Sequence, residues 1–360
     1  MSFPFSDDHD MIREAVRGVL QDAYDGGKGP EHIYNSGTGY DAALWTSFAQ
    51  ELGMAGIAID EAYGGAALGD LGRVVVMEEL GASLASIPFS PSGTIAADMI
   101  AGVGSDEAKE EWLPKIAAGE AILAYTDGHD ALTVEGGKIS GRVNMVLYGA
   151  QADVVLMSLR DGDTFKLIGI PKEVEGYSAE TIETMDPTRS FSNVILQDVA
   201  MTDVLHLGAG TPEQFDAIVK TSFIGLAAEC VGGAQKALDM TLEYLGQRVQ
   251  FGRPIASFQA IKHRAADMYI AIEAARNAVY AAAMAEGDDK IEAAIIAKAY
   301  ASDAFFEVAG HAIQLHGGIG FTWEYPLHYF FKRARANRAV FGQSAREYER
   351  LATILLGEAA

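Results

Sequence analysis

The chain has little cysteine and proline and no excess of positive charge. Of its 360 residues, one is cysteine and ten are proline. The single cysteine, Cys230, excludes an internal disulfide, and the apolar run around it favours a small buried side chain. The formal net charge of -23 would repel nucleic acid and anionic membranes. Neither is therefore an expected partner.

The sequence also lacks the signals of export and of a membrane span. The acidic start of the chain contains no apolar core of the kind that a secretion signal needs. No apolar run reaches the roughly 18 residues that cross a bilayer. Internal repeats and low-complexity segments are missing, and no metal site is predicted. We expect a cytoplasmic protein.

Hydrophobic residues make up 49% of the chain, which is enough for a substantial core, and their spacing divides the chain into three regions. Residues 1–120 predict helices, because apolar residues recur at helical spacing after Ser6 and because Ser105 can cap a further helix. Residues 121–210 contain short β-rich runs separated by glycine and aspartate turns. They predict an antiparallel β domain, because no helical crossover fits between the runs.

The remaining residues, 211–360, predict a helical bundle. Thr211 and Pro212 are typical of a helix start. Three long amphipathic stretches and a final shorter helix follow, at residues 215–244, 260–286, 291–315 and 344–356. Because these stretches exceed the average helix of about 11 residues, we expect a four-helix bundle. The fold class is therefore α+β, in the order α, β, α.

Five segments in this order carry a specific resemblance to one family. They are Glu51–Ile57 with Glu61–Gly65, Val75–Gly81, Gly104–Glu120, Arg248–Gln259 and Gln314–Pro326. Together they resemble the acyl-CoA dehydrogenases over nearly the whole chain. The resemblance implies an N-terminal α domain, a middle β domain and a C-terminal four-helix bundle, with FAD as cofactor.

Two of these segments also have a physical interpretation of their own. Gly317, Gly318 and Gly320 would let the backbone approach a ligand closely, although a plain loop that ends a helix is the alternative. Arg248 could donate charge-assisted hydrogen bonds to a pyrophosphate, or could be an ordinary surface arginine. Phe251 could pack against an adenine or belong to the core.

In the family, these segments reach across a subunit interface. There they hold the adenosine–pyrophosphate end of an FAD that the neighbouring subunit binds. By resemblance, the cofactor-binding residues here are Arg248, Gln250, Phe251, Phe258, Gln259, Gln314, His316, Gly317 and Gly318.

The segments that hold the flavin ring in the family are altered here. Residues 125–130 are shorter than the family loop and lack its series of hydroxyls and glycines. On the following strand, Met145 and Leu147 stand where a tryptophan and a threonine are expected. Leu147 has no hydroxyl that could bond a flavin, so the resemblance predicts an impaired ring-side site.

Both places that can carry the family's catalytic glutamate lack a carboxylate. One holds Gly342 or Gln343, depending on a one-residue gap, and the other holds Ser222. A base that removes the α-proton of a thioester must be an ionised carboxylate at neutral pH, so none of these residues can replace it.

Three other glutamates are the nearest substitutes in sequence. Glu229 lies in an apolar stretch, where a buried and paired carboxylate is the simpler interpretation. For Glu347 and Glu349, beside arginines on the last helix, ordinary surface charge is the simpler one. No catalytic residue is therefore predicted.

The sequence predicts a subunit without a catalytic glutamate in a tetramer with a base-carrying homologue. The complex would dehydrogenate the α,β bond of an acyl-CoA, as in the degradation of lipids or steroid side chains, with an electron-transfer flavoprotein as acceptor. Two alternatives stay open. One is a self-sufficient homotetrameric dehydrogenase with a displaced base, and the other is a non-enzymatic acyl-CoA-binding or scaffold protein on the same fold.

Overall fold

The computed structural model describes residues 5–24, 36–128, 130–342 and 344–357. The chain forms two compact units, and each takes segments from distant parts of the sequence. The helical unit comprises Met1–Leu20, Val74–Ala85 and Phe223–Ala360. The mixed unit comprises Gln21–Arg73 and Ser86–Ser222. The predicted domain boundaries at residues 120 and 210 stay a prediction.

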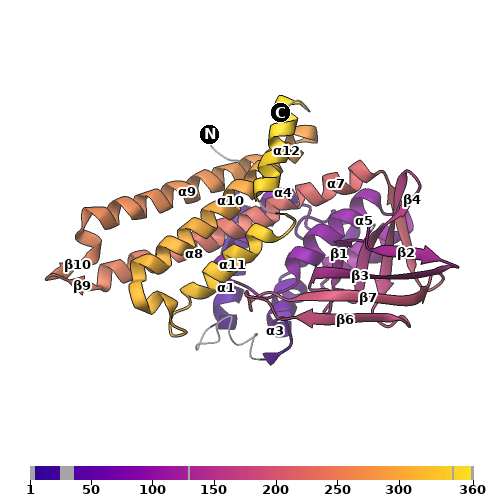
Figure 1. Cartoon of the computed structure of the whole chain (residues 1–360), viewed down its shortest axis with the longest axis horizontal. Coiled ribbons are helices and arrows are strands. Elements are labelled where there is room, and N and C mark those ends of the chain that lie inside the picture. Colours follow the sequence, from indigo (N-terminus) through magenta and orange to yellow (C-terminus); the bar gives the residue numbers. More distant parts are fainter. Residues whose placement is uncertain (1–4, 25–35, 129, 343, 358–360) are drawn as a thin grey trace. The chain divides into compact units, whose positions relative to one another are not determined.

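Three long helices lie side by side in the helical unit (Figure 1). They are α8 (Phe223–Gln247), α9 (Gln259–Met284) and α10 (Gly287–His316). Two shorter helices pack on α10, namely α11 (Leu327–Ala339) and α12 (Ser344–Leu356). The predicted helical C-terminal region is confirmed, but the sequence pattern missed α11. Its buried face carries Arg333, so its apolar periodicity is weak.

Two N-terminal helices complete this unit: α1 (Asp7–Tyr24) and the second part of α4 (Gly69–Ser83). Helix α4 crosses α8 so closely that no side chain fits between the backbones. A Cβ atom on Gly81 would lie 2.1 Å from the carbonyl oxygen of Glu229, and one on Gly232 would lie 1.8 Å from that of Glu78. Only glycine permits this crossing at both points.

The buried carboxylate of Glu78 joins α4 to two further helices. It accepts a hydrogen bond from Arg13 of α1 at 2.9 Å and lies 3.4 Å from the guanidinium of Arg276 on α9. Burial of an ionised carboxylate is tolerated only when such partners compensate for its lost hydration. The N-terminal helices are thus held to the bundle by both shape and charge.

The mixed unit contains two four-stranded sheets, with strand orders β1-β4-β5-β8 and β2-β3-β7-β6. The strands are β1 (Leu123–Asp127), β2 (Leu132–Glu135), β3 (Lys138–Leu147), β4 (Val154–Asp161), β5 (Thr164–Pro171), β6 (Tyr177–Ile182), β7 (Phe191–Ala200) and β8 (Leu205–Gly210). The pairs are antiparallel except β1 with β4, which is parallel. The predicted antiparallel β domain is confirmed, and the parallel pair is possible because β2 and β3 of the other sheet provide the crossover without a helix.

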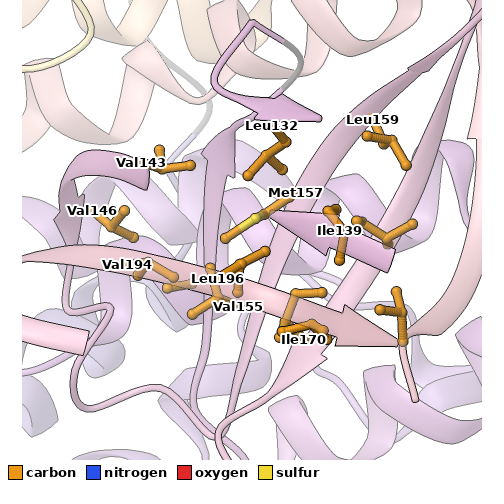
Figure 2. Packing of buried hydrophobic residues seen from close by; sticks show 14 of the residues in the cluster. Leu132, Ile139, Val143, Val146, Val155, Met157, Leu159, Ile170, Val194 and Leu196 are labelled. Atoms are coloured by element: carbon orange, nitrogen blue, oxygen red, sulfur yellow. The ribbon is translucent and has the colours of Figure 1, made fainter. Parts of the chain in front are cut away.

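The core of the mixed unit lies between strands of these two sheets. Figure 2 shows Val155 and Met157 of β4 facing Ile139 of β3 and Leu196 of β7. Their side chains are almost completely removed from water. Each buried aliphatic side chain contributes about 1.5–3 kcal/mol through the hydrophobic effect, so this layer fixes the positions of β3 and β4.

The helices of the mixed unit begin and end largely where the sequence indicates. Ser105 caps α6 and accepts a hydrogen bond from the backbone of Ala108, and Thr211 caps α7. Gly53, in the left-handed region at φ 71°, ends the first helical stretch. The α- and π-helical segments are α3 (Ala42–Trp45), η1 (Thr46–Glu51), η4 (Ser90–Ala96), α5 (Ala97–Val103), α6 (Asp106–Ala117) and α7 (Pro212–Thr221).

One stretch, Pro212–Gln247, is long and apolar enough to cross a membrane by length and composition alone. It comprises α7 and α8, and the sequence analysis did not single it out. In the structure 72% of its most apolar window is buried, as in a core helix. It is weak support for a membrane span.

Candidate functional site

The predicted cofactor-binding residues lie on two loops at one end of the helical unit. A hairpin of β9 (Val249–Gln250) and β10 (Arg253–Pro254) leads from α8 through η5 (Ile255–Ser257) to α9. The second loop, η6 (Gly317–Phe321), follows α10. The ring of Tyr244, near the end of α8, stacks on His316 at the end of α10 with 4.4 Å between centroids. Residues 72 positions apart in sequence, Tyr244 and His316, therefore meet at the end that carries β9 and β10 in Figure 1.

The hairpin presents the aromatic ring of Phe251 to solvent, and Arg248, directly before the hairpin, presents an exposed guanidinium. Phe251 is 92% exposed and has a φ of 54°, a left-handed conformation that costs a non-glycine residue on the order of 1 kcal/mol. The core interpretation of Phe251 was wrong. Phe258 lies edge-on to it at 6.1 Å and supports the guanidinium of Arg253 at 4.1 Å. Among the residues that the structure describes, no carboxylate pairs with the exposed side chain of Arg248.

The three remaining polar or small candidates on these loops are also open to solvent. Gln259 begins α9, Gln314 lies in the last turn of α10, and both are exposed. Gln250 is exposed on β9, where its amide donates to the carbonyl oxygen of Val249 at 2.8 Å. Amide groups at these positions can form hydrogen bonds with a ligand that approaches the end of the unit.

The glycines of the second loop differ in whether the structure requires a glycine at their position. Gly317 has a φ of 64°, which the helix-ending interpretation explains. Gly318 is exposed, its φ is outside the left-handed region, and a Cβ atom there would meet nothing within 4 Å. Nothing in the described structure requires glycine at that position, whereas a molecule resting on the backbone would. Gly320 is different, because it is buried and a Cβ atom there would lie 2.9 Å from the carbonyl oxygen of Ile313, so it serves internal packing.

His316 is the one candidate that does not reach the surface. Its ring is buried between Tyr244 and Tyr325, with centroids at 4.4 and 4.8 Å. Its Nδ1 lies 2.8 Å from the carbonyl oxygen of Ala312 and therefore donates the proton there. Burial lowers the pKa of His316. The structure thus gives His316 a supporting role beneath the loop.

The lowered pKa of His316 has a consequence for stability. As the pH falls through the ordinary histidine range near 6.5, the unfolded chain takes up a proton that the folded chain resists, so unfolding becomes more favourable. His316→Phe keeps a ring in the stack and removes the titration. We expect the urea midpoint of this variant to fall less steeply between about pH 7 and 5. His263→Phe, at an exposed histidine, is the control, and equal slopes for His316→Phe and the wild type would contradict the prediction.

The segments that face the flavin ring in the family have a different form here. Met145 lies at a bulge of β3 with a φ of 61° and is 52% exposed. Leu147 is buried and paired with Phe191 of β7, so its side chain belongs to the sheet. After β1 the backbone N–H of Leu132 donates to the carbonyl oxygen of Gly128 at 3.1 Å, and His129 lies outside the described residues. Neither Met145 nor Leu147 offers a hydroxyl like that of the family's threonine.

The expected base positions have structural roles. The Ser222 hydroxyl donates to the carbonyl oxygen of Val219 at 2.6 Å at the end of α7. Gly342 has a φ of 108° in the loop between α11 and α12, and Gln343 lies outside the described residues. The two described residues provide no carboxylate.

The substitute carboxylates differ in environment. Glu229 is buried and accepts a hydrogen bond from Arg333 at 2.6 Å, as the paired interpretation predicts. Glu349 is exposed. For Glu347 the surface interpretation was wrong, because its side chain is 0% exposed and both its oxygens lie 3.0 Å from Arg350. The sequence signal was the amphipathic spacing of α12, which places Glu347 on the same face as Leu351.

Sequence reasoning also missed a buried cation near these residues. Lys298 lies in the middle of α10, fully buried, and its Nζ donates to the carbonyl oxygen of Gly342. Burial lowers its pKa, an effect that the negative charge of Glu347 opposes. A lysine within the run Ala293–Tyr300 was the signal that could have identified it.

Comparison with known proteins gives consistent matches along the chain. Residues 6–120 match the N-terminal domain and residues 221–356 the C-terminal domain of the acyl-CoA dehydrogenases. The acyl-CoA dehydrogenase IpdE2 of Mycolicibacterium smegmatis is 32% identical over 96% of this chain and 98% of its own.

Solved structures are similar as well. A variant of the Tcur3481–Tcur3483 steroid acyl-CoA dehydrogenase has a TM-score of 0.87 and 29% identity over 98% of this chain and 99% of its own. The ChsE4–ChsE5 complex of Mycobacterium tuberculosis has a TM-score of 0.89 and 25% identity, with full coverage of both chains. The fold, the motifs and these matches together show that the chain belongs to the acyl-CoA dehydrogenase family.

Proposed function

We propose that the chain is the subunit without a catalytic glutamate in a hetero-oligomeric acyl-CoA dehydrogenase. The observation that carries the proposal is the contrast between its two sets of site residues. The adenosine-side residues Arg248, Phe251 and Gly318 are exposed in the described structure. The expected base positions Ser222 and Gly342 hold no carboxylate.

The adenosine-side residues fit the far end of an FAD molecule. Arg248 would donate charge-assisted hydrogen bonds to the pyrophosphate, and Phe251 would pack against the face of the adenine. The open backbone at Gly318 would let the nucleotide lie close to the loop. Bound FAD would supply the hydride acceptor of the reaction. The ring-side positions do not fit it equally well, because Leu147 is buried and Met145 replaces an expected tryptophan.

A partner subunit would supply what is missing. Dehydrogenation of an acyl-CoA thioester requires removal of the α-proton while the β-hydrogen leaves as hydride, and the first step needs an ionised carboxylate. We infer that a homologous subunit provides that glutamate and the contacts to the flavin ring. Similarity to a steroid acyl-CoA dehydrogenase and to the ChsE4–ChsE5 complex supports both a steroid-derived acyl group and an assembly of unlike subunits.

The electron acceptor follows from related proteins in the same way. One relative is a subunit of a caffeyl-CoA reductase–Etf complex, and one similar structure is described as an electron-transferring flavoprotein. We therefore infer that an electron-transfer flavoprotein reoxidises the complex. A tetramer in the cytoplasm remains our proposal for the assembly and its location.

The test is co-expression with a homologous acyl-CoA dehydrogenase subunit that carries the catalytic glutamate. The chain alone is expected to hold little flavin and to reduce no acceptor with any acyl-CoA. The complex is expected to contain FAD and to oxidise a bulky acyl-CoA. Absorbance of bound flavin, subunit stoichiometry and acceptor reduction are the measurements. Full flavin occupancy and turnover by the pure chain would overturn the proposal.

A self-sufficient dehydrogenase is the second candidate, and one observation favours it. A Cβ atom on Gly342 would lie 3.2 Å from Oε1 of Glu347, so a carboxylate lies close to one expected base position. If Glu347 were a displaced base, Glu347→Gln in the pure chain would abolish a turnover that the wild type shows. Its pairing with Arg350 and complete burial favour a structural role instead.

A further inference from the structure

The loop between α11 and α12 is attached to α10 by a buried lysine. Lys298 is 0% exposed, and its Nζ donates to the carbonyl oxygen of Gly342. Burying an ammonium group costs several kcal/mol unless hydrogen bonds and opposite charge compensate for its lost hydration. The compensation comes from that carbonyl oxygen and from the negative charge of Glu347. This contact therefore joins α10 to the backbone of Gly342.

A second attachment point lies on the same helix, five residues further along. The carboxylate of Asp303 accepts a hydrogen bond from the hydroxyl of Ser344 at 2.9 Å and pairs with Arg338 at 2.6 Å. The Tyr348 hydroxyl donates to it at 3.3 Å. Since Arg338 lies at the end of α11 and the other two on α12, Asp303 fixes both sides of the loop.

The backbone and the surroundings of Gly342 disfavour a carboxylate at this position. Its φ of 108° lies in the region that disfavours any residue with a Cβ atom. A Cβ atom there would also lie 3.2 Å from Oε1 of the buried Glu347. A glutamate at this position would place a second negative charge beside a carboxylate that Arg350 already neutralises.

An apolar contact closes the same region from α8. The ring of Phe341 stacks on Phe223 with 6.0 Å between centroids, and Phe223 is buried at the first turn of that helix. The Nζ of Lys298 lies 5.8 Å from the Phe223 ring. The loop is thus fixed by a hydrogen bond, a cluster of ion pairs and a ring stack at once.

We propose that Lys298, Asp303 and Glu347 form an anchor that fixes residues 340–342 and the start of α12 and disfavours a carboxylate at position 342. The anchor rests on the proposed function in one respect. It would explain why this chain needs a glutamate from its partner. A single substitution at position 342 cannot restore a base, because the new carboxylate would compete with Glu347 for the same cations.

The test is a double-mutant cycle on the pure full-length chain. Gly342→Glu is expected to lower the melting temperature at least about 4 °C further than Gly342→Ala, which carries the same backbone strain without the charge. Glu347→Gln alone is expected to be destabilising, because it weakens the pairing with Arg350. In the Gly342→Glu background the same change should cost less or restore stability. Additive effects of Gly342→Glu and Glu347→Gln, or equal melting temperatures for Gly342→Glu and Gly342→Ala, would overturn the anchor.

A second measurement does not depend on how well these variants fold. Lys298→Met should increase amide hydrogen exchange across residues 344–356 at least tenfold, while Lys262→Met, at an exposed lysine of α9, should leave it unchanged. Unchanged exchange in Lys298→Met would also overturn the anchor. Both measurements use the chain without partner or flavin. Their failure would leave the proposed function standing, and failure of the co-expression test would leave the anchor standing.

Discussion

Replacing Arg333 by methionine is expected to destabilise the protein by about 3–5 kcal/mol. The side chains of Arg333 and Glu229 are 1% and 3% exposed, and Nη1 of Arg333 lies 2.6 Å from Oε1 of Glu229. Removing the arginine alone leaves an ionised carboxylate in the core of the helical unit without its closest cation. The loss of that compensation, rather than the net attraction of the pair, sets the size of the effect. Urea denaturation of the pure chain would measure it.

Two further variants make this expectation specific. Arg335→Met removes an exposed arginine from the same helix, and surface changes of this kind stay within about 0.5 kcal/mol. The double replacement Glu229→Leu with Arg333→Met takes both charges out of the core and should recover most of the loss. If the single Arg333→Met variant proved as stable as Arg335→Met, the buried pair would not have the role assigned to it.

Arg248→Ala is expected to weaken FAD binding by the complex about 10- to 100-fold without altering the stability of the chain. The guanidinium is exposed and has no carboxylate partner in the described part of the chain, so its removal disturbs no internal contact. A hydrogen bond to a charged group contributes about 1.5–3 kcal/mol, which corresponds to this range of affinity. Equilibrium titration of the apo-complex with FAD would give the dissociation constant.

The matched control for this prediction is Arg335→Ala on α11. It removes the same charge from an exposed site outside the two loops, so general electrostatic attraction is lost equally. Equal FAD affinity in the two variants would mean that Arg248 contributes only long-range charge. Loss of complex formation in Arg248→Ala would instead show that the residue contacts the partner and not the nucleotide.

Local signals predicted the parts of the fold that depend on local chemistry. Ser105 and Thr211 begin helices because their side chains satisfy free backbone N–H groups, and this requirement is visible in the sequence. The parallel pairing of β1 with β4 was not predictable in this way, because it depends on which sheet β2 and β3 join. The same limit applies to Arg333, whose partner lies 104 residues away.

In the candidate site, too, features set by local sequence were predictable and features set by distant contacts were not. The spacing of the motifs identified both loops and the exposed residues on them, which we propose to contact a ligand outside the chain. Burial of Glu347 and Lys298 could not be read from their neighbours, because each is enclosed by helices from other parts of the sequence. The position of His316 was missed for a related reason. Its motif predicts that it lies in the loop, but its ring stacks with Tyr244 and Tyr325 beneath the loop.

The close crossing of α4 and α8 has a consequence for how the chain reaches its folded state. The helical unit needs residues 1–20 and 74–85 as well as everything after residue 222, so it cannot be completed until the last third of the chain has been synthesised. Until then the carboxylate of Glu78 and the apolar faces of α1 and α4 lack their final environment. Contacts between such distant segments form slowly, because a long intervening chain must first be ordered. Nascent chains would therefore expose an acidic and apolar N-terminal surface, on which a chaperone or an early partner subunit could act before α8 arrives.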